Sequence, residues 1–187
     1  MIFSETQTNY TLKAAPLSSA EELLSGLWVV IAGTDRIPPH IALLFGGKYY
    51  SLTVKKVNLG APPEKMMKAL ERRPTPTLFV KIKTGRLSSG YVSAELEKIF
   101  ASCSTLGTGE YTCLTPMSRF FAKTYSGKYQ HTELVFELLA HAEKDAIIEN
   151  CKSLFIQHPA FKIEHSTLIE LPKYSIHHVK DKIRSLI

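Results

Sequence analysis

The 187-residue chain contains little cysteine and no arrangement of cysteines that would indicate a disulfide framework or a zinc site. Cys103, Cys113 and Cys151 are too few and too scattered for the first, and no Cys-x-x-Cys pair is present for the second. His177 and His178 are adjacent, so they point to different sides of a helix and do not form a metal-binding pair. We therefore expect reduced thiols in a cytoplasmic protein, with no metal and no cofactor.

The chain also lacks long apolar runs and a strong excess of charge of either sign. No stretch approaches the roughly 20 apolar residues that a membrane helix needs. Residues 1–6 lack the basic and apolar regions of a secretory leader, so neither a membrane span nor export is expected. The formal net charge of +6, from 23 basic and 17 acidic residues, favours acidic partners without identifying nucleic acid.

What the sequence does contain is a predicted β-hairpin at 38–53. Two apolar and aromatic runs flank Gly46-Gly47, and glycine tolerates the positive φ angles that tight hairpin turns require. Counting outward from this turn sets His40 opposite Thr53, with Ser51 as a diagonal neighbour. The face with His40 carries these hydroxyls, and the other face is apolar enough to pack on a core.

The rest of the chain predicts an α+β fold, an antiparallel sheet with helices, in a single domain over 1–187. Residues from about 129 onward form an alternative C-terminal α/β extension, and 134–139 fit a strand or a helix equally well. The remaining predictions are strands at 27–32, 77–83 and 161–165, and helices at 20–24, 64–73, 93–103, from a cap at either Thr112 or Thr115, from Asp145 to about 155, and from Ser175.

Cys113 is the candidate nucleophile. Cys103 and Cys151 fall on apolar helical stripes and are expected in the core, whereas Cys113 precedes a helix, a setting that lowers the pKa of a thiol. His40, on the predicted hairpin, is the histidine best placed to act as its general base. Thr53 or Ser51 would orient the imidazole, and the N–H groups around Cys113 would receive an oxyanion.

These residues resemble the circularly permuted papain-like fold over roughly 36–125. The similarity consists of a histidine that opens a strand, a glycine-containing turn, an aromatic second strand, and a later Tyr111-Thr112-Cys113 at a helix start. The group includes lecithin:retinol acyltransferase-like proteins, PPPDE isopeptidases and permuted NlpC-type hydrolases. This chain has Thr112 where members commonly carry asparagine or another polar residue, and a hydroxyl where a second histidine often lies.

The resemblance implies a thiol hydrolase or acyltransferase that acts on an amide, an isopeptide or a thioester. Cys113 would match the nucleophile of the family and His40 its base, with Thr53 or Ser51 where a third polar group often lies. Tyr111, Thr112 and Tyr49 are the expected contacts of a peptide-like or acyl substrate. The sequence does not identify that substrate.

The alternative is a non-enzymatic binding module. Basic residues are interleaved with aromatic residues, as contact with phosphates and stacking on bases require, at Lys48-Tyr49-Tyr50, Lys55-Lys56, Arg72-Arg73 and 81–86. Such a module would bind nucleic acid, although the mild net charge favours an ordinary solvated surface. A papain-like fold that serves as a noncatalytic protein-interaction domain is the third interpretation.

Overall fold

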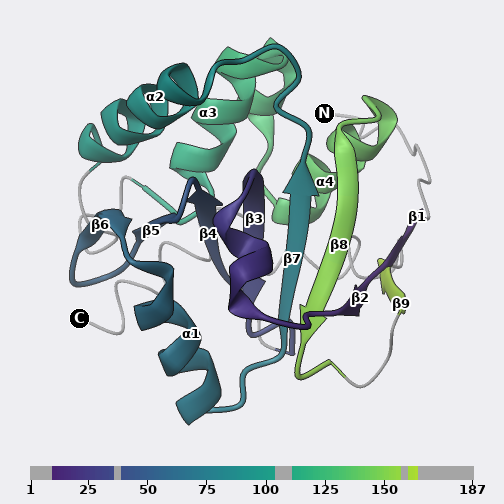
Figure 1. The fold of residues 1–187 in the computed structure, drawn as a ribbon. Coiled ribbons are helices and arrows are strands. Elements are labelled where there is room, and N and C mark those ends of the chain that lie inside the picture. The colour runs from purple at the N-terminus through teal and green to yellow at the C-terminus, as the bar shows by residue number, and fades with distance from the viewer. Residues whose placement is uncertain (1–9, 36–38, 104–110, 157–159, 164–187) are drawn as a thin grey trace.

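The computed structural model describes residues 10–35, 39–103, 111–156 and 160–163. Its described part is an α+β arrangement around a seven-stranded sheet in the order β2-β8-β7-β3-β4-β5-β6, which confirms the predicted fold class (Figure 1). All neighbours in this sheet are antiparallel except β2 and β8, which are parallel. The strands are β2 (Ala15–Pro16), β3 (Leu27–Ala32), β4 (His40–Phe45), β5 (Lys48–Leu52), β6 (Val57–Ala61), β7 (Thr77–Ile82) and β8 (Ile148–Leu154).

Consecutive strands β3 to β6 form an antiparallel meander, and the predicted hairpin is its centre. The register of β4 and β5 is the predicted one: Leu44 pairs with Tyr49, and Ala42 pairs with Ser51. Pairing between the two strands ends there, so His40 lies two residues beyond the last paired residue of β4. On its other side His40 pairs with Ala32 of β3.

Helices cover both faces of the sheet. They are η1 (Ala20–Leu24), α1 (Pro63–Arg72), α2 (Ser89–Ala101), α3 (Thr115–Thr124), η3 (Gly127–His131) and α4 (Val135–Lys144), of which η1 and η3 are short 3-10 helices. Residues of α2, α3 and α4 pack on one face, which includes Leu43 and Tyr50. Residues of α1 and η1 pack on the other, which includes Ala42 and Leu44. The face that carries His40 is therefore covered as well, which explains the unbroken apolar runs in β3 and β4.

The helix predicted from Asp145 to about 155 is wrong, because this segment forms β8. Cys151 and Ser153 are buried at alternate positions, and β8 pairs with β7 along its length. Apolar residues at helical spacing in a short segment also fit a strand, and pairing with β7 decides the outcome. The helix lies one segment earlier. Residues 134–139, which fit a strand or a helix by sequence, lie at the start of α4 (Val135–Lys144). Cys151 is buried as predicted, but on a strand.

The segment from about 129 onward contributes to the same sheet as the meander, since β8 lies between β2 and β7 (Figure 1). The strand predicted at 161–165 is present as β9 (Ala160–Ile163), which pairs antiparallel with β1 (Tyr10–Lys13). The helix predicted from Ser175 lies outside the described residues. No helix within the described ranges is long and apolar enough to cross a membrane.

The turn between β4 and β5 gives a test of the hairpin. Gly46 and Gly90 both have open space where a Cβ would be added, but only Gly46 has a positive φ, at +55°. We expect Gly46→Ala to lower the free energy of unfolding by about 1 kcal/mol, because the left-handed region is costly for any residue with a Cβ. Gly90→Ala, the matched control on α2, should leave it unchanged or slightly raised. Urea unfolding measures both, and equal effects would contradict the turn geometry.

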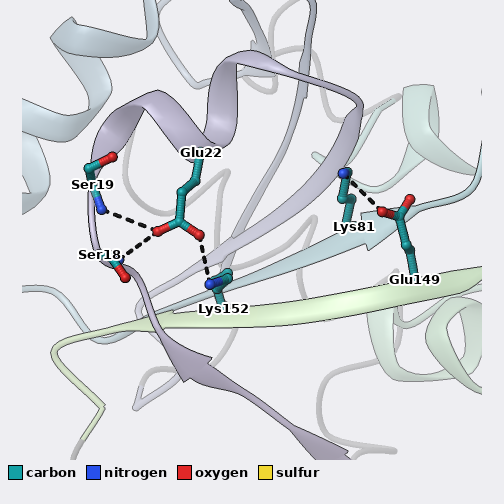
Figure 2. Close-up of polar contacts among 6 residues, drawn as sticks. All are labelled: Ser18, Ser19, Glu22, Lys81, Glu149 and Lys152. Carbon is teal, nitrogen blue, oxygen red and sulfur yellow. Dashed lines mark hydrogen bonds and ion pairs between the residues drawn. The ribbon is translucent and has the colours of Figure 1, made fainter.

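Glu22 ties η1 to β8. Its Oε1 accepts hydrogen bonds from the backbone N–H groups of Ser18 (2.7 Å) and Ser19 (3.2 Å). Its Oε2 lies 2.6 Å from Nζ of Lys152 (Figure 2). The hydrogen bond with Lys152, followed by that from Ser18, lowers the pKa of Glu22 from 4.5 to about 2. The carboxylate thus connects the N-terminal segment to a strand from the other end of the chain.

This contact predicts a pH dependence of stability. Because the folded-state pKa of Glu22 is lowered, its stabilisation is present above the unfolded value near 4.5 and is lost as the pH falls toward 2. Glu22→Gln should therefore lower the urea midpoint near neutral pH and lower it less near pH 2. The control is Glu71→Gln on the exposed side of α1. A deficit of the same size at both pH values would exclude ionisation of Glu22 as its cause.

Candidate functional site

His40 is the first residue of β4, and its partly buried ring contacts the second strand of the hairpin. Nε2 of His40 lies 3.2 Å from the hydroxyl oxygen of Tyr49 on β5. Burial lowers the pKa of His40 from its usual 6.5, because it disfavours the charged imidazolium. The resting histidine is therefore neutral at pH 7, the form in which an imidazole can accept a proton.

Cys113 lies in the turn that precedes α3, as expected. Thr112 and Thr115 close this turn: the N–H of Thr112 donates to Oγ1 of Thr115 (3.0 Å), and the N–H of Thr115 donates to the carbonyl of Thr112 (3.1 Å). The N-cap position of α3 is Leu114 and makes no side-chain cap. Neither threonine therefore caps the helix, and both instead fix the backbone that carries the thiol.

Cys113 is partly exposed at the residue level, and the pKa of its thiol depends on backbone groups around it. Hydrogen bonds from the backbone N–H groups of Ile41, Cys113 and Leu114 favour the thiolate, but burial outweighs them and raises the pKa of Cys113 above 9.0. The expectation that a helix N-terminus lowers this pKa is wrong, because the sequence does not reveal the burial of the thiol. The contact with Ile41 brings the sulfur to the residue that follows His40.

Tyr49 connects the two groups electrostatically. Burial raises the pKa of Tyr49, a hydrogen bond with Ser51 lowers it, and the charge of a Cys113 thiolate raises it further. The Tyr49 hydroxyl is thus hydrogen-bonded to His40 and lies within electrostatic range of Cys113. Tyr49 packs with the cluster of α1 and Cys113 with the cluster of α3, so the two groups interact by charge and not by direct contact.

The other predicted site residues take different positions. Ser51 is fully buried, and its Oγ accepts a hydrogen bond from Nδ2 of Asn58 (2.6 Å). The hydroxyl of Thr53 donates to the carbonyl of Lys56 (2.7 Å) in the turn that follows β5. The hydroxyl that contacts the His40 ring is therefore that of Tyr49, which the sequence analysis predicts as a substrate contact, and not that of Ser51 or Thr53. The contact of Asn58 with Ser51 was not predicted, because the sequence analysis did not assign a partner strand to the segment that forms β6.

Tyr111 and Thr112, the two predicted substrate contacts before the thiol, are partly and fully buried, respectively. The guanidinium of Arg119 on α3 lies over the ring of Tyr111, 5.1 Å from its centroid. Arg119 is exposed, so this stack forms the solvent side of the loop that carries Cys113. Sequence patterns gave no indication of it, since Arg119 belongs to an ordinary amphipathic helix.

The two other cysteines are core residues. Cys103 is 5% exposed and packs with Leu52, and Cys151 is equally buried on β8. Burial raises the pKa of Cys103, and it raises that of Cys151 to about 11. No group of three potential metal ligands occurs within the described ranges. His177 and His178 lie outside them.

Two of the lysines proposed for nucleic-acid binding pair with carboxylates of the protein, and one of the tyrosines is buried. Lys48 pairs with Glu97 (2.8 Å), and Lys81 pairs with Glu149 (2.9 Å), as Figure 2 shows for the second pair. Tyr50 is fully buried. The aromatic rings of this segment therefore face the interior, where they cannot stack on nucleotide bases.

Comparisons with protein families, with curated proteins and with solved structures found no match to this chain. The resemblance to permuted papain-like proteins therefore stays a prediction. Inference of function depends on the geometry of the Cys113–His40 site.

The raised pKa of Cys113 predicts its alkylation behaviour. We expect the rate of its reaction with iodoacetamide to rise with pH through a midpoint above that of the same cysteine in the urea-unfolded chain, because burial disfavours the thiolate. Peptide mapping of the alkylated protein over a pH series measures this. Cys151, whose pKa is raised to about 11, provides a comparison within the same samples. A Cys113 midpoint at or below the unfolded one would contradict the burial seen here.

Proposed function

We propose that this protein is a thiol hydrolase or acyltransferase that acts on an amide, an isopeptide or a thioester. The observation that carries the proposal is the effect of the backbone N–H of Ile41, the residue that follows His40 in β4, on the pKa of the Cys113 thiol. These residues are far apart in the sequence, and their meeting depends on the whole sheet and helix arrangement. A thiol nucleophile must stay reduced, so the proposal includes a cytoplasmic location.

The resting protonation states suit a general-base mechanism. Burial keeps the thiol of Cys113 and the imidazole of His40 neutral, since it raises the first pKa and lowers the second. As the sulfur attacks a substrate carbonyl, an S–C bond forms and the thiol proton passes to His40. The carbonyl π electrons move to the oxygen. No charge on the thiol is needed before the substrate arrives.

The tetrahedral intermediate then collapses. The C–X bond to the leaving nitrogen or sulfur breaks, the leaving group takes the proton from His40, and Cys113 carries the acyl group as a thioester. Water completes a hydrolysis, and another nucleophile completes a transfer. The N–H groups of Cys113 and Leu114, which favour negative charge on the sulfur, support the oxyanion two bonds away.

The structure offers less support for the binding alternatives. Lys48 and Lys81 are paired with carboxylates, which lowers the charge available for phosphate contact. A noncatalytic interaction domain would need neither a neutral histidine nor a sulfur contact at the start of β4. The enzymatic proposal accounts for both.

Assays with p-nitrophenyl esters, peptide anilides and acyl thioesters test the proposal. We expect Cys113→Ala to abolish turnover and His40→Ala to lower it by about 10²–10⁴-fold, the usual contribution of a general base. Intact-mass measurement should show an acyl group on Cys113 that hydroxylamine removes. Cys151→Ala, which removes a buried thiol far along the sheet, is the matched control and should keep its activity.

Several outcomes would overturn the proposal. If the Cys113→Ala variant keeps its turnover, the nucleophile is a group other than Cys113. A folded parent protein with no turnover and no acyl adduct in any of the three substrate classes would exclude the enzymatic function. Binding of a partner by Cys113→Ala in that case would favour the noncatalytic interaction domain.

A further inference from the structure

Arg119 is an exposed cation on α3 that the fold holds beside the loop of Cys113. Its guanidinium carbon lies over the ring of Tyr111, 5.1 Å from the centroid. Its Nη1 donates to the sulfur of Cys103 at 3.9 Å. Contacts with two different segments restrict a long side chain that would otherwise sample many rotamers in water. The positive charge of Arg119 therefore has a defined position on the surface.

This position is next to the candidate nucleophile. Tyr111 precedes Cys113 by two residues, so their Cα atoms are at most about 7 Å apart. Helical side chains lean toward the N-terminus of their helix, so Arg119 leans from the second turn of α3 toward the turn that Thr112 and Thr115 close. Its contact with Tyr111 agrees with that direction. A separation on the order of 10 Å between the guanidinium and the thiol follows from these spans.

Arg119 has no carboxylate partner among the residues that the structure describes. α3 itself contains neither aspartate nor glutamate. α2 lies beside α3 (Figure 1), and its two glutamates, Glu95 and Glu97, both pair with lysines. Cys103 does not supply the missing charge, because burial raises the pKa of its thiol and keeps it neutral at pH 7. The guanidinium is thus available to an anion from outside the protein.

We propose that Arg119 binds a carboxylate of the substrate, and thereby selects amides, isopeptides or thioesters that carry one close to the scissile carbonyl. A guanidinium presents paired N–H groups that match the two oxygens of a carboxylate. Only Nη1 is used within the described part of the chain, in its contact with Cys103. Because Tyr111 and Cys103 already hold the side chain, little conformational entropy is lost when a carboxylate binds. This inference rests on the proposed function and names the substrate class of the Cys113 site.

Alkylation of Cys113 by two reagents tests the effect of this charge without any substrate. Iodoacetate and iodoacetamide react by the same displacement, but only iodoacetate carries a carboxylate. Any change in the pKa of the thiol affects both rates equally and cancels in their ratio. We expect Arg119→Gln to lower the ratio of the iodoacetate rate to the iodoacetamide rate by about 2- to 16-fold, the range for one charge about 10 Å away at effective dielectric constants between about 80 and 20. Peptide mapping of the full chain measures both rates at Cys113.

Arg86→Gln is the matched control. Arg86 is also exposed, but it follows the end of β7 that lies farthest from Ile41 in the register of the sheet. It removes the same charge and should leave the ratio at Cys113 unchanged. Added salt should lower the ratio of the parent protein toward that of Arg119→Gln, because ions screen exposed charges. A ratio that Arg119→Gln does not change, or that both variants change equally, would overturn the proposal.

Pairs of thioesters test the selectivity. Succinyl and butyryl thioesters have acyl chains of equal length, and only the succinyl group ends in a carboxylate. Acetyl thioesters of 3-mercaptopropionate and of propanethiol place the same difference on the leaving group. For the carboxylate member of at least one pair, we expect the higher kcat/KM in the parent and a KM that Arg119→Gln raises by about 10-fold with little change in kcat. Arg119→Lys keeps the charge without the paired N–H groups and should recover only part of that loss.

The outcomes separate this inference from the proposed function. If the alkylation ratio at Cys113 depends on Arg119 in a protein that turns over no substrate, Arg119 remains a carboxylate-binding residue and the enzymatic proposal fails. If turnover needs Cys113 and His40 while both members of each pair react equally in the parent and in Arg119→Gln, the enzymatic proposal stands and the inference about Arg119 fails.

Discussion

The burial of the central strands on both faces is the constraint on which the rest of the structure depends. β3 and β4 lie between the α1 layer and the layer of α2, α3 and α4, and nearly every residue of the two strands is shielded from water. Such strands tolerate polar groups only at their ends, where a partner can reach them. His40 stands at such an end, and the hydroxyl of Tyr49 on β5 is its polar partner. The same burial that stabilises the sheet thus defines the electrostatic environment of the site.

Desolvation gives this site a different character from one that keeps an ion pair at rest. Burial disfavours the thiolate and the imidazolium alike, so the neutral forms of Cys113 and His40 are the stable ones. The backbone N–H groups around the sulfur and the Tyr49 hydroxyl beside the ring are the fixed dipoles of the site. A neutral buried thiol is also less reactive toward oxidants than a thiolate.

Much of the meander was predictable, whereas Tyr49 as the partner of His40 was not. Gly46-Gly47 and the alternation around them determine the register, which the structure confirms. The contact between Tyr49 and His40 depends on how far a ring extends along the face of the sheet, which pairing rules do not give. β8 was mistaken for a helix because its apolar spacing suits both structures and its partner β7 is distant in the sequence. The pKa of Cys113 was predicted in the wrong direction, since helix position is visible in a sequence and burial is not.

The order of strands in the sheet also has a kinetic meaning. β3 to β6 are neighbours in the sequence and in space, whereas β2 gains its neighbour in the sheet only when β8, near the other end of the described chain, is in place. Contacts of short sequence separation form with a smaller loss of chain entropy and therefore faster. His40, Tyr49, Ser51 and Asn58 all belong to the local meander, and Cys113 comes from a later segment. During synthesis from the N-terminus, His40 and Tyr49 thus come together before the ribosome has delivered Cys113.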